Sequence, residues 1–526
     1  MSRRAQEPCD AQAEVIAFLA DPRSYTPKPE TVKRIDTHGA MVFLAGDAAY
    51  KIKRAVKYPY MDFSTLEKRQ AVCEQEIAVN RDNAPDIYLG TVPITRAADG
   101  RLAFGGDGEV VEWAVSMRRF DETRSLDRIA ERAGLDDALL ARLAERIAAA
   151  HARAPIRRDF DQGAAFAKLV SQDEQEFAAA PELFDPEKAR RLIGGTRAEL
   201  KRNAKLLAAR GTAGHVRRCH GDLHLKNLVL IDDEPVLFDA IEFDEDIATV
   251  DVLYDLAFLL MDLETRVMRH GANLVLNTYL KAARQDAHLD GLAALPLFLS
   301  SRAAIRARVT ASLSAHEHGR ARTADAQVAR SYFEAALGFL KPEPARLIAV
   351  GGLSGSGKTT IARMLAPHIG AAPGAIHLRS DVERKVLFGV AETERLGPRG
   401  YSPEASRKTY ERLFTLAGRV LGAGRSVIVD AVFARPKERG AIKAVARERA
   451  APFTGLWLDT PEEVMIARVE DRRGDASDAR AEIVRQQLNY DLGEIDWTRI
   501  SAAGTPGEVL AAALSRVQSG SQRSAR

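Results

Sequence analysis

The stretch "GLSGSGKT", Gly352–Thr359, constrains the fold of this chain more than any other feature of it. It matches the pattern GxxxxGK[ST], and it lies between an apolar segment, "LIAV", and a segment with helical periodicity, "TTIARMLA". In that setting glycines let backbone N–H groups turn inward around an anion, and the N-terminus of the next helix adds partial positive charge. The stretch therefore predicts a strand, a phosphate-binding loop and a helix.

Three further apolar segments follow the loop: "GAIHLRSD", "SVIVDAVF" and "FTGLWLDT". Each is short enough for a strand and is followed by a stretch with helical character. Strands that alternate with helices form a parallel sheet with helices on both faces. The C-terminal part is therefore predicted to be an α/β domain with a parallel sheet covered by helices.

The loop predicts a nucleotide site in which each residue has a definite task. Lys358 is expected to contact the β- and γ-phosphates, and Thr359 is expected to hold Mg²⁺. The residues expected to bind the nucleotide are Gly352, Ser354, Gly355, Ser356, Gly357, Lys358, Thr359 and Thr360.

These motifs make about residues 345 to 515 resemble the P-loop small-molecule and polynucleotide kinases, which include gluconate-kinase-like, chloramphenicol-phosphotransferase-like and zeta-toxin-like enzymes with an AAA-type ATP-binding domain. In that group an Asp soon after the second strand accepts the proton of the attacking hydroxyl. The resemblance gives that role to Asp381 in "LRSDVERK". The alternative is a helix N-cap, because Ser380 and Asp381 precede an apolar-periodic stretch.

Two further roles come from the same resemblance. Asp430 ends the segment "SVIVD", and it is expected to hold Mg²⁺ through water; the alternative is an ordinary turn residue at a strand end. A mobile lid in the family carries arginines to the transferring phosphoryl group, which points to Arg472, with Arg468 one helical turn before it and Arg473 beside it. The alternative for these arginines is a solvated, charged helix end.

A second polar cluster lies far upstream, in "HGDLHLKN", residues 220–227. His220, Asp222 and His224 alternate as metal ligands on a strand would. That interpretation uses neither Asn227 nor the downstream Asp239, and the glycine within the segment weakens a strand. A metal hydrolase is therefore disfavoured.

The same segment matches HGDxxxxN and resembles the catalytic loop of aminoglycoside-phosphotransferase-like and choline-kinase-like enzymes, relatives of protein kinases that carry HRDxxxxN. The resemblance covers about residues 25 to 315. It implies that Asp222 positions or deprotonates the substrate hydroxyl and that Asn227 binds Mg²⁺. Asp239, one hairpin later in "PVLFDA", is the second expected metal ligand.

A kinase-like domain also needs a strand lysine for the phosphates and a helix glutamate that holds this lysine. The segment "AAYKIKR" offers Lys51 or Lys53, and the helix after it offers Glu74 or Glu76. We favour Lys51, because it follows an apolar pair directly, with Glu76 as its partner. The resemblance thus implies a protein-kinase-like two-lobed domain.

The domain organisation follows from these patterns. Strands and one helix dominate to about residue 120, and helices dominate from 124 to 215 and from 249 to 339. A chain of 526 residues exceeds one hydrophobic core. The prediction combines α/β and α+β architecture: a kinase-like domain at 1–340, a proline-containing linker at 341–344, a P-loop kinase domain at 345–515 and a disordered tail at 516–526.

The composition limits which classes of binding partner are expected. The net charge of +3 balances 76 basic against 73 acidic residues, so neither nucleic acid nor a membrane is an expected partner. Three scattered cysteines and the lack of a signal-like segment favour the cytoplasm. A helical stretch with Arg302, Arg306 and Arg308 favours a small-molecule substrate that is anionic if this face lines the acceptor site; the alternative is an outward, solvated face.

Together these features predict an ATP-dependent kinase with two phosphotransferase domains that transfers the γ-phosphate to hydroxyl groups of small molecules, with ATP and Mg²⁺ as cofactors. A first alternative makes the P-loop domain a nucleotide sensor that regulates the kinase-like domain. A second makes the first half a pseudokinase binding module, because only Gly39 and Gly46 lie where a phosphate-covering loop is expected.

Overall fold

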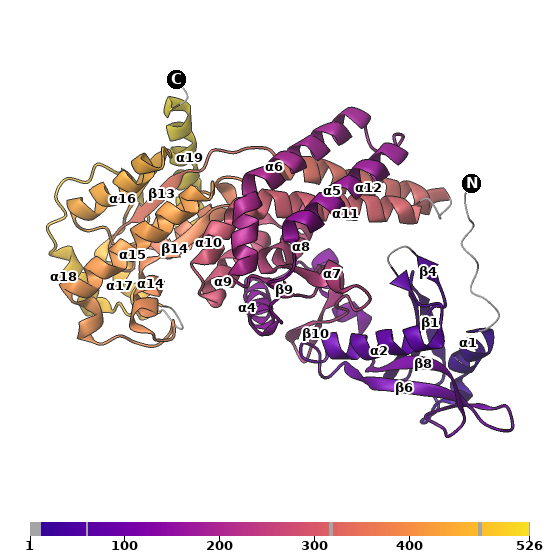
Figure 1. The fold of residues 1–526 in the computed structure, drawn as a ribbon. Coiled ribbons are helices and arrows are strands. Elements are labelled where there is room, and N and C mark those ends of the chain that lie inside the picture. The colour runs from indigo at the N-terminus through magenta and orange to yellow at the C-terminus, as the bar shows by residue number, and fades with distance from the viewer. Residues whose placement is uncertain (1–11, 59–60, 315–318, 472–475, 525–526) are drawn as a thin grey trace. The chain divides into compact units, whose positions relative to one another are not determined.

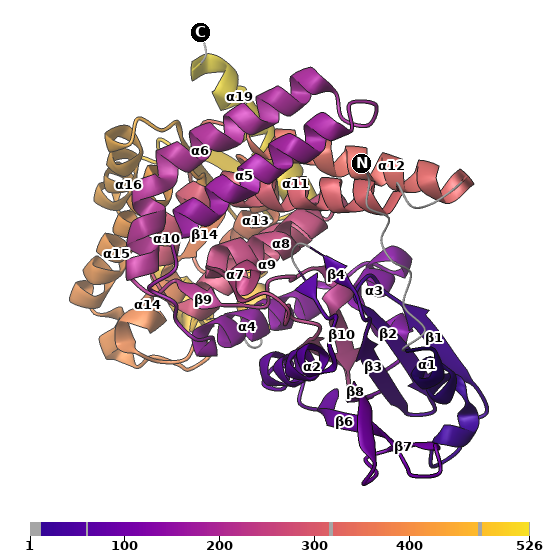
Figure 2. The ribbon, with the colours of Figure 1, turned by 45° about the vertical axis from the view of Figure 1, so that its right-hand side comes forward.

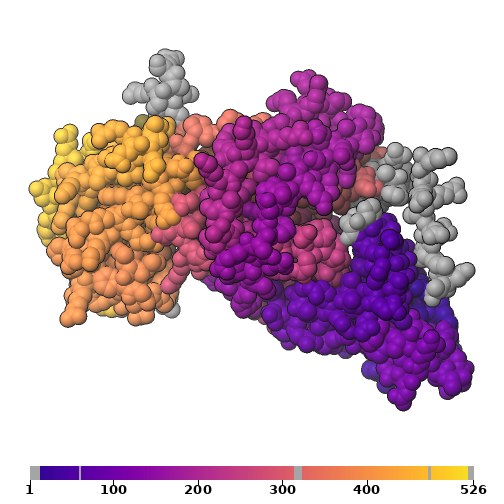
Figure 3. All heavy atoms as spheres, in the orientation of Figure 1, coloured from indigo at the N-terminus to yellow at the C-terminus, as the bar shows by residue number. Residues whose placement is uncertain are grey.

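The computed structural model describes residues 12–58, 61–314, 319–471 and 476–524, which carry colour in Figures 1 and 3. The chain divides into two compact units. The first comprises Met1–Gln162 and Ala208–Asp262, and the second comprises Gly163–Leu207 and Leu263–Arg526.

The first unit contains a six-stranded antiparallel sheet with the order β1-β2-β3-β8-β6-β7 (Figure 2). Strands were expected in this part of the chain, although the sequence of β1, "VKRID", offers little apolar surface. The strands are β1 (Val32–Asp36), β2 (Ala40–Ala45), β3 (Ala48–Lys53), β6 (Tyr88–Arg96), β7 (Leu102–Phe104) and β8 (Glu109–Arg118). Two short strands, β4 (Lys57–Tyr58) and β5 (Met61–Asp62), pair with each other.

Two helices pack against this sheet, and alternation along β8 shows that they cover opposite faces. Val115 packs with the helix α2 (Leu66–Asn80), whereas its neighbour Ala114 packs in the cluster that holds α1 (Ala13–Ala20). Successive residues of a strand point to opposite faces of its sheet. Thr65 fixes the start of α2, since its side chain accepts a hydrogen bond from the N–H of Lys68.

The segment with the second polar cluster forms a compact set of short elements. β9 (Val216–Arg218) pairs with β12 (Thr249–Asp251), and β10 (Leu228–Ile231) pairs with β11 (Glu234–Leu237). The β10–β11 turn has positive φ at Asp232 and Asp233, as the two-residue turns of hairpins require.

Helices make up the rest of the kinase-like region, as expected. Those that begin before residue 213 are α3 (Leu126–Arg132), α4 (Asp137–Arg153), α5 (Gln162–Ala179) and α6 (Pro186–Thr212). Those after the polar cluster are α7 (Glu245–Ala248), α8 (Val252–Thr265), α9 (Arg269–Ala283), α10 (Ala287–Gly291), α11 (Leu295–Ser314) and α12 (Gly319–Phe339). In Figures 1 and 2, α11 and α12 run side by side.

The arginine face of α11 points into the packing of these helices. Arg308 lies 3.0 Å from Asp173 and 3.2 Å from Glu176, both on α5. Arg306 lies over the ring of Tyr332, and Arg302 is buried. The charge of Arg308 is therefore neutralised inside the helical region, and the face is not the outward, solvated stripe considered from the sequence.

The P-loop region contains a five-stranded, wholly parallel sheet with the order β14-β15-β13-β16-β17 and helices around it (Figure 1). The α/β prediction is confirmed. The sheet consists of β13 (Leu347–Gly351), β14 (Ile376–Arg379), β15 (Val427–Asp430), β16 (Phe453–Asp459) and the unexpected β17 (Thr498–Ser501). Its helices are α13 (Lys358–Leu365), α14 (Ser380–Phe388), α15 (Pro403–Gly422), α16 (Pro436–Glu448), α17 (Glu462–Glu470), α18 (Ala481–Leu488) and α19 (Pro506–Ser524).

The predicted disordered tail at 516–526 begins too early. The helix α19 runs on to Ser524, and Val517 is buried in the core of the P-loop region. Val517 lies four residues after Ala513, so it extends the buried face of this helix. The Ser- and Gly-rich composition of the tail gives little indication of this packing. No helix in the described part of the chain is long and apolar enough to cross a membrane.

A buried ion pair gives a stability prediction for the first unit. Arg210 donates to both carboxylate oxygens of Asp251, at 2.6 and 2.8 Å, and both side chains are almost fully buried. We expect Asp251→Asn to cost about 3–5 kcal/mol, because it leaves the guanidinium buried without a counter-charge. Denaturant unfolding with hydrogen exchange across β9 and β12 measures this. The matched change Asp99→Asn, in the exposed pair with Arg101, should cost less than about 1 kcal/mol; equal effects would contradict the prediction.

Candidate active sites

Two lysines and one glutamate form the centre of the first site. Lys51 and Lys53 share a face of β3, and both reach Glu76 on α2: Lys51 Nζ lies 2.8 Å from Oε1 and Lys53 Nζ lies 2.6 Å from Oε2. Glu76 is fully buried, whereas Glu74 is an exposed residue that accepts a hydrogen bond from Gln70. Glu76 is therefore the glutamate that meets the strand lysines.

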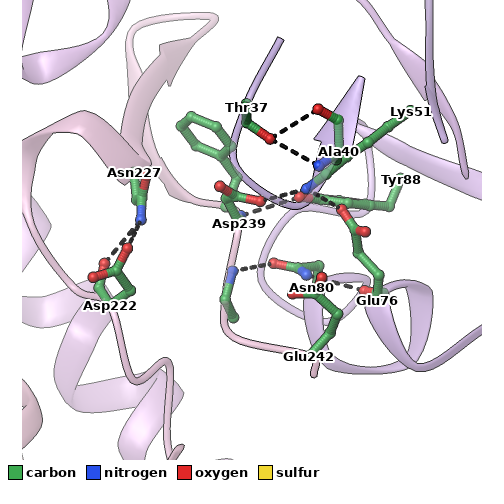
Figure 4. A network of polar contacts seen from close by, with 12 residues as sticks. Thr37, Ala40, Lys51, Glu76, Asn80, Tyr88, Asp222, Asn227, Asp239 and Glu242 are labelled. Carbon is green, nitrogen blue, oxygen red and sulfur yellow. Dashed lines mark hydrogen bonds and ion pairs between the residues drawn. The ribbon is translucent and has the colours of Figure 1, made fainter. Parts of the chain in front are cut away.

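The two lysines differ in their second partner. Lys51 Nζ also lies 2.8 Å from Oδ1 of Asp239 (Figure 4), whereas Lys53 pairs with Glu242 instead. The Lys51 side chain is 13% exposed and the Lys53 side chain 1%. The structure thus brings together Lys51, Glu76 and Asp239, as expected, and gives Lys53 a more deeply buried position.

The charges in this cluster stabilise one another. Burial opposes the charge of Glu76, but Lys51 and Lys53 outweigh burial and lower the pKa of Glu76. Burial likewise opposes the charge of Lys51, but Asp239 and Glu76 raise its pKa well above the usual value. Glu76 and the two lysines are therefore held in their charged forms at neutral pH.

Asp239 follows β11 in a strained backbone conformation. Its φ is +58°, in the left-handed region that non-glycine residues seldom adopt. Its N–H donates to the hydroxyl of Tyr88, at 3.0 Å, and the next N–H, of Ala240, donates to Asn80 Oδ1 at 2.8 Å. These bonds hold the half-exposed Asp239 carboxylate beside Lys51 (Figure 4).

Asp222 and Asn227 lie on the loop that precedes β10. The amide Nδ2 of Asn227 donates to the backbone oxygen of Asp222, at 3.0 Å, and to its Oδ2, at 2.9 Å (Figure 4). The amide oxygen of Asn227 therefore keeps its acceptor capacity. The oxygen donors of Asn227 and Asp239 are of the kind that Mg²⁺ prefers, so this pair fits the expected ion.

Buried residues outside the motif hold this loop in place. Asp255 accepts from the N–H of Gly221, at 2.8 Å, and of His220, at 3.3 Å, and His151 Nε2 lies 3.1 Å from the same carboxylate. Asp262 accepts from the N–H of Leu225, at 3.0 Å. Sequence analysis missed both acids, although two aspartates in the apolar segment "VLYDLAFLLMDL" were a usable signal.

The histidines of the loop have supporting positions. His220 Nε2 lies 2.9 Å from the backbone oxygen of Phe238, next to Asp239, and burial lowers the pKa of His220. His224 packs edge-on against Phe258 and lies 3.3 Å from Asp222. His220 thus ties the loop to the segment that carries Asp239.

In the second site, glycines permit close packing of the phosphate-binding loop. Gly355 has φ +82°, and a Cβ there would lie 2.4 Å from the backbone oxygen of Met465. The N–H of Ser354 donates to Gln487 Oε1, at 2.7 Å, and Lys358 Nζ donates to the backbone oxygen of Leu353, at 2.8 Å. The expected loop and helix are present, because α13 begins at Lys358.

Asp430 ends β15 and is buried beside this loop. His377 Nε2 lies 2.7 Å from its Oδ2. Burial would raise the pKa of Asp430, but the hydrogen bond from His377 and the charges of His377, Arg379 and Lys358 lower it. Asp430 and Thr359 line the same cavity, and a carboxylate with a hydroxyl is an oxygen donor set that fits Mg²⁺.

Asp381 is the second residue of α14. The residue at the N-cap is Arg379, and no side chain caps this end, so the helix-cap alternative for Asp381 does not hold. Asp381, Lys358 and Asp430 line one cavity of about 1750 Å³. Burial, and then the charge of Asp430, raise the pKa of Asp381.

The expected lid arginines lie at the edge of what the structure describes. Arg472 and Arg473 fall outside the described residues. Arg468, at the end of α17, donates through Nη2 to the backbone oxygen of Ala502, at 2.9 Å, and lies near the backbone oxygen of Ser356.

Family models match both halves of the chain. Residues 65–295 match the phosphotransferase enzyme family, and residues 347–491 match an AAA domain. The chain joins a phosphotransferase-family domain to a P-loop kinase-like domain. The expected kinase-like fold followed by a P-loop fold is thereby confirmed.

Proteins similar to this chain match most of its length or one part of it. Uncharacterized proteins of Mycobacterium tuberculosis and Mycobacterium bovis are 29% identical over 481 residues, 89% of this chain and 92% of theirs. An adenylyl-sulfate kinase of Myxococcus xanthus is 28% identical over 117 residues, 22% of this chain and 59% of its own. Among solved structures, a choline/ethanolamine kinase family protein from Mesorhizobium loti is 17% identical, covers 63% of this chain and 99% of its own, and has a TM-score of 0.37.

The different burial of the two strand lysines gives a prediction. In a chain whose second site is disabled by Lys358→Ala, we expect Lys51→Met to weaken Mg-ATP binding about tenfold to hundredfold, since one charge-assisted hydrogen bond is lost. Lys53→Met should instead destabilise the first unit by about 3–5 kcal/mol, because Glu242 loses its counter-charge and Glu76 loses one of two. Calorimetric titration and denaturant unfolding measure the two effects. The exposed Lys33, changed to Met, serves as the control; reversed effects at Lys51 and Lys53 would refute the assignment.

Proposed function

We propose that this protein is an ATP-dependent phosphotransferase with two active sites, each of which transfers the γ-phosphate of ATP to a hydroxyl group of a small molecule. One observation carries the proposal: each half holds a lysine, oxygen donors suited to Mg²⁺ and a further carboxylate around one site. In the first half these are Lys51, Asn227 with Asp239, and Asp222. In the second half these are Lys358, Thr359 with Asp430, and Asp381, and all of them line one cavity.

In the first site, Lys51 binds the nucleotide phosphates while Glu76 and Asp239 hold its ammonium group in place. Asn227 and Asp239 would hold Mg²⁺, which neutralises phosphate charge when bound. Asp222 faces the acceptor hydroxyl, orients it and takes its proton as the oxygen–phosphorus bond forms and the bond to the leaving ADP oxygen breaks. The bond from Asn227 keeps Asp222 in position.

In the second site, the N–H groups of the loop and Lys358 bind the phosphates. Thr359 and Asp430 would hold the Mg²⁺ there. Asp381, whose raised pKa makes it a stronger base than an exposed aspartate, accepts the hydroxyl proton of the acceptor. The adenylyl-sulfate kinase relative supports phosphorylation of a small hydroxyl-bearing molecule by this half.

Two single substitutions test the proposal. We expect Asp222→Ala and Lys358→Ala each to remove a different labelled product when the full chain is incubated with γ-labelled ATP and a metabolite extract, because each disables one site. Each loss should exceed about hundredfold, as expected for a group that acts on the reacting atoms. Mass spectrometry identifies the products. The exposed residues Asp99 and Lys33, changed to Ala, serve as controls; if neither half labels any acceptor, the proposal fails.

A regulatory role for the P-loop half is the second candidate, and a specific set of contacts favours it. The helix α9 meets the strand before the second site: Asn277 Oδ1 accepts from the N–H of His377, at 2.8 Å, and the His377 ring contacts Asp430. On α10, Asp286 binds Arg412 of α15, at 3.0 Å, and Arg412 also binds Glu383 of α14. Helices that precede residue 340 in the chain are thus bonded to the elements that carry Asp381 and Asp430.

The two candidates differ in what Lys358→Ala does to the first site. Two independent kinases predict that the product lost in Asp222→Ala is made at an unchanged rate in Lys358→Ala. A sensor predicts that this product also falls, by about fivefold or more, and that the P-loop site labels nothing itself. The rate of that one product, measured in both variants, decides between them. Asn277→Ala should reproduce the effect only if the contact of α9 with His377 transmits it.

A further inference from the structure

A serine of the chain itself lies against the carboxylate that is proposed as the base of the P-loop site. Ser477 lines the same cavity as Asp381, Lys358 and Thr359. Burial and then the charge of Asp430 raise the pKa of Asp381, and a hydrogen bond donated by the Ser477 side chain is among the contacts that lower it. A hydroxyl group of the protein therefore occupies the place next to Asp381 that the proposed reaction gives to an acceptor hydroxyl.

The two neighbours of Ser477 fix its position in the fold. Ala476, before it, is buried. Asp478, after it, is a partly buried carboxylate that accepts three hydrogen bonds: from Lys385 Nζ at 2.9 Å, from the N–H of Leu396 at 2.9 Å and from the hydroxyl of Tyr401 at 2.7 Å. Ser477 thus lies between a buried side chain and a side chain bonded to three separate groups.

The spacing of these contacts along α14 supports the position of Ser477 by geometry. Asp381 and Lys385 are four residues apart on this helix, so they lie on one face of it with their Cβ atoms about 5–6 Å apart. Successive Cα atoms in a chain are about 3.8 Å apart. A stretch of chain that follows this face can therefore bring Asp478 to Lys385 and, at the same time, Ser477 to Asp381.

The groups proposed to hold the phosphates lie in the same place. Lys358 is the first residue of α13, and its charge acts on both Asp381 and Asp430, so the three side chains are close in space. A hydroxyl bonded to a base and a γ-phosphate held by a lysine are the parts that phosphoryl transfer requires. A reaction between groups that the protein holds together is favoured over the same reaction between separate molecules.

We propose that Ser477 is a phosphorylation site of the chain's own P-loop domain, modified in cis by ATP. The proposal rests on the phosphotransferase function proposed above for this site. Ser477 Oγ forms a bond to the γ-phosphorus, the bond from that phosphorus to the leaving oxygen of ADP breaks, and the hydroxyl proton passes to the Asp381 carboxylate. The products are phosphoserine and ADP. A serine that only stabilised the charge of Asp381 would stay unmodified in the presence of ATP.

Phosphate incorporation into the chain tests this inference. The full chain with Asp222→Ala, which disables the first site, is incubated with Mg²⁺ and γ-labelled ATP without any acceptor. We expect label on the chain, and mass spectrometry of its peptides should place the phosphate on Ser477. Adding Ser477→Ala or Lys358→Ala should lower the label about hundredfold or more, because the first removes the nucleophile and the second a phosphate-binding group.

Another serine of the cavity supplies the matched control. Ser406 lies on α15 and lines the same cavity, but its Oγ contacts Arg384, at 3.4 Å, instead of Asp381. We expect Ser406→Ala to leave the label on the chain unchanged. Thermal unfolding of both serine variants confirms that they are folded. The mapping of the phosphate in the unmutated P-loop domain needs no serine variant.

Modification in cis has a kinetic signature. The rate constant of labelling per chain should stay the same when the protein is diluted about tenfold, because both reactants belong to one complex. A chain that carries Lys358→Ala has an intact Ser477 but cannot modify it. When this chain is made distinguishable by a tag and mixed with the active chain, it should take up no label.

Three results would overturn the inference: no label on the chain, label that maps to another residue and persists in Ser477→Ala, or label that passes to the tagged Lys358→Ala chain. An unlabelled chain that still phosphorylates molecules of a metabolite extract through the P-loop site would refute self-modification alone. Label on Ser477 without any labelled metabolite would support self-modification and refute the proposed small-molecule acceptor. The two failures are therefore distinguishable.

Discussion

Glu76 carries a full negative charge in a position that water does not reach, and the first site depends on how that charge is neutralised. Two lysines from one strand meet its two oxygen atoms, and each lysine then binds a second carboxylate. Removing Lys53 leaves the buried Glu242 without its lysine and Glu76 with one lysine instead of two, which costs several kcal/mol. The cluster therefore fixes α2 against β3 and, through Lys51, sets the position of Asp239.

The same arrangement explains why the sequence limited the strand lysine to Lys51 or Lys53 but could not choose between them. Lys51 and Lys53 are two residues apart and share a face of the strand, so periodicity cannot separate them. Both in fact reach Glu76, and only their depth differs. The depth of each lysine in the protein depends on its second partner, Asp239 or Glu242, and both partners lie nearly 190 residues farther along the chain.

Features that depend on consecutive residues were predictable from local patterns, and the meeting of Lys51, Glu76 and Asp239 was predictable only from the family resemblance. Other contacts between distant residues were not predictable. The phosphate-binding loop lies between a strand and a helix within one short segment, so its fold follows from local patterns. The anchoring acids Asp255 and Asp262 bond backbone N–H groups more than 30 residues away, and Gln487 bonds the loop at Ser354 from 133 residues away. Contacts between residues so far apart in the chain produce no periodic pattern in the sequence.

The two sites also differ in what holds the phosphate-binding lysine. In the first, Lys51 already points at Asp239, and the strained backbone of Asp239 is held by hydrogen bonds from its own and the next N–H group. In the second, Lys358 donates to its own loop. An ammonium group has three N–H donors, so this bond to the loop is compatible with phosphate binding. Each lysine is thus held by acceptors of its own site, by two carboxylates at the first site and by a backbone oxygen of the phosphate-binding loop at the second. The first arrangement depends on residues far apart in the chain, whereas the second is contained within one short segment.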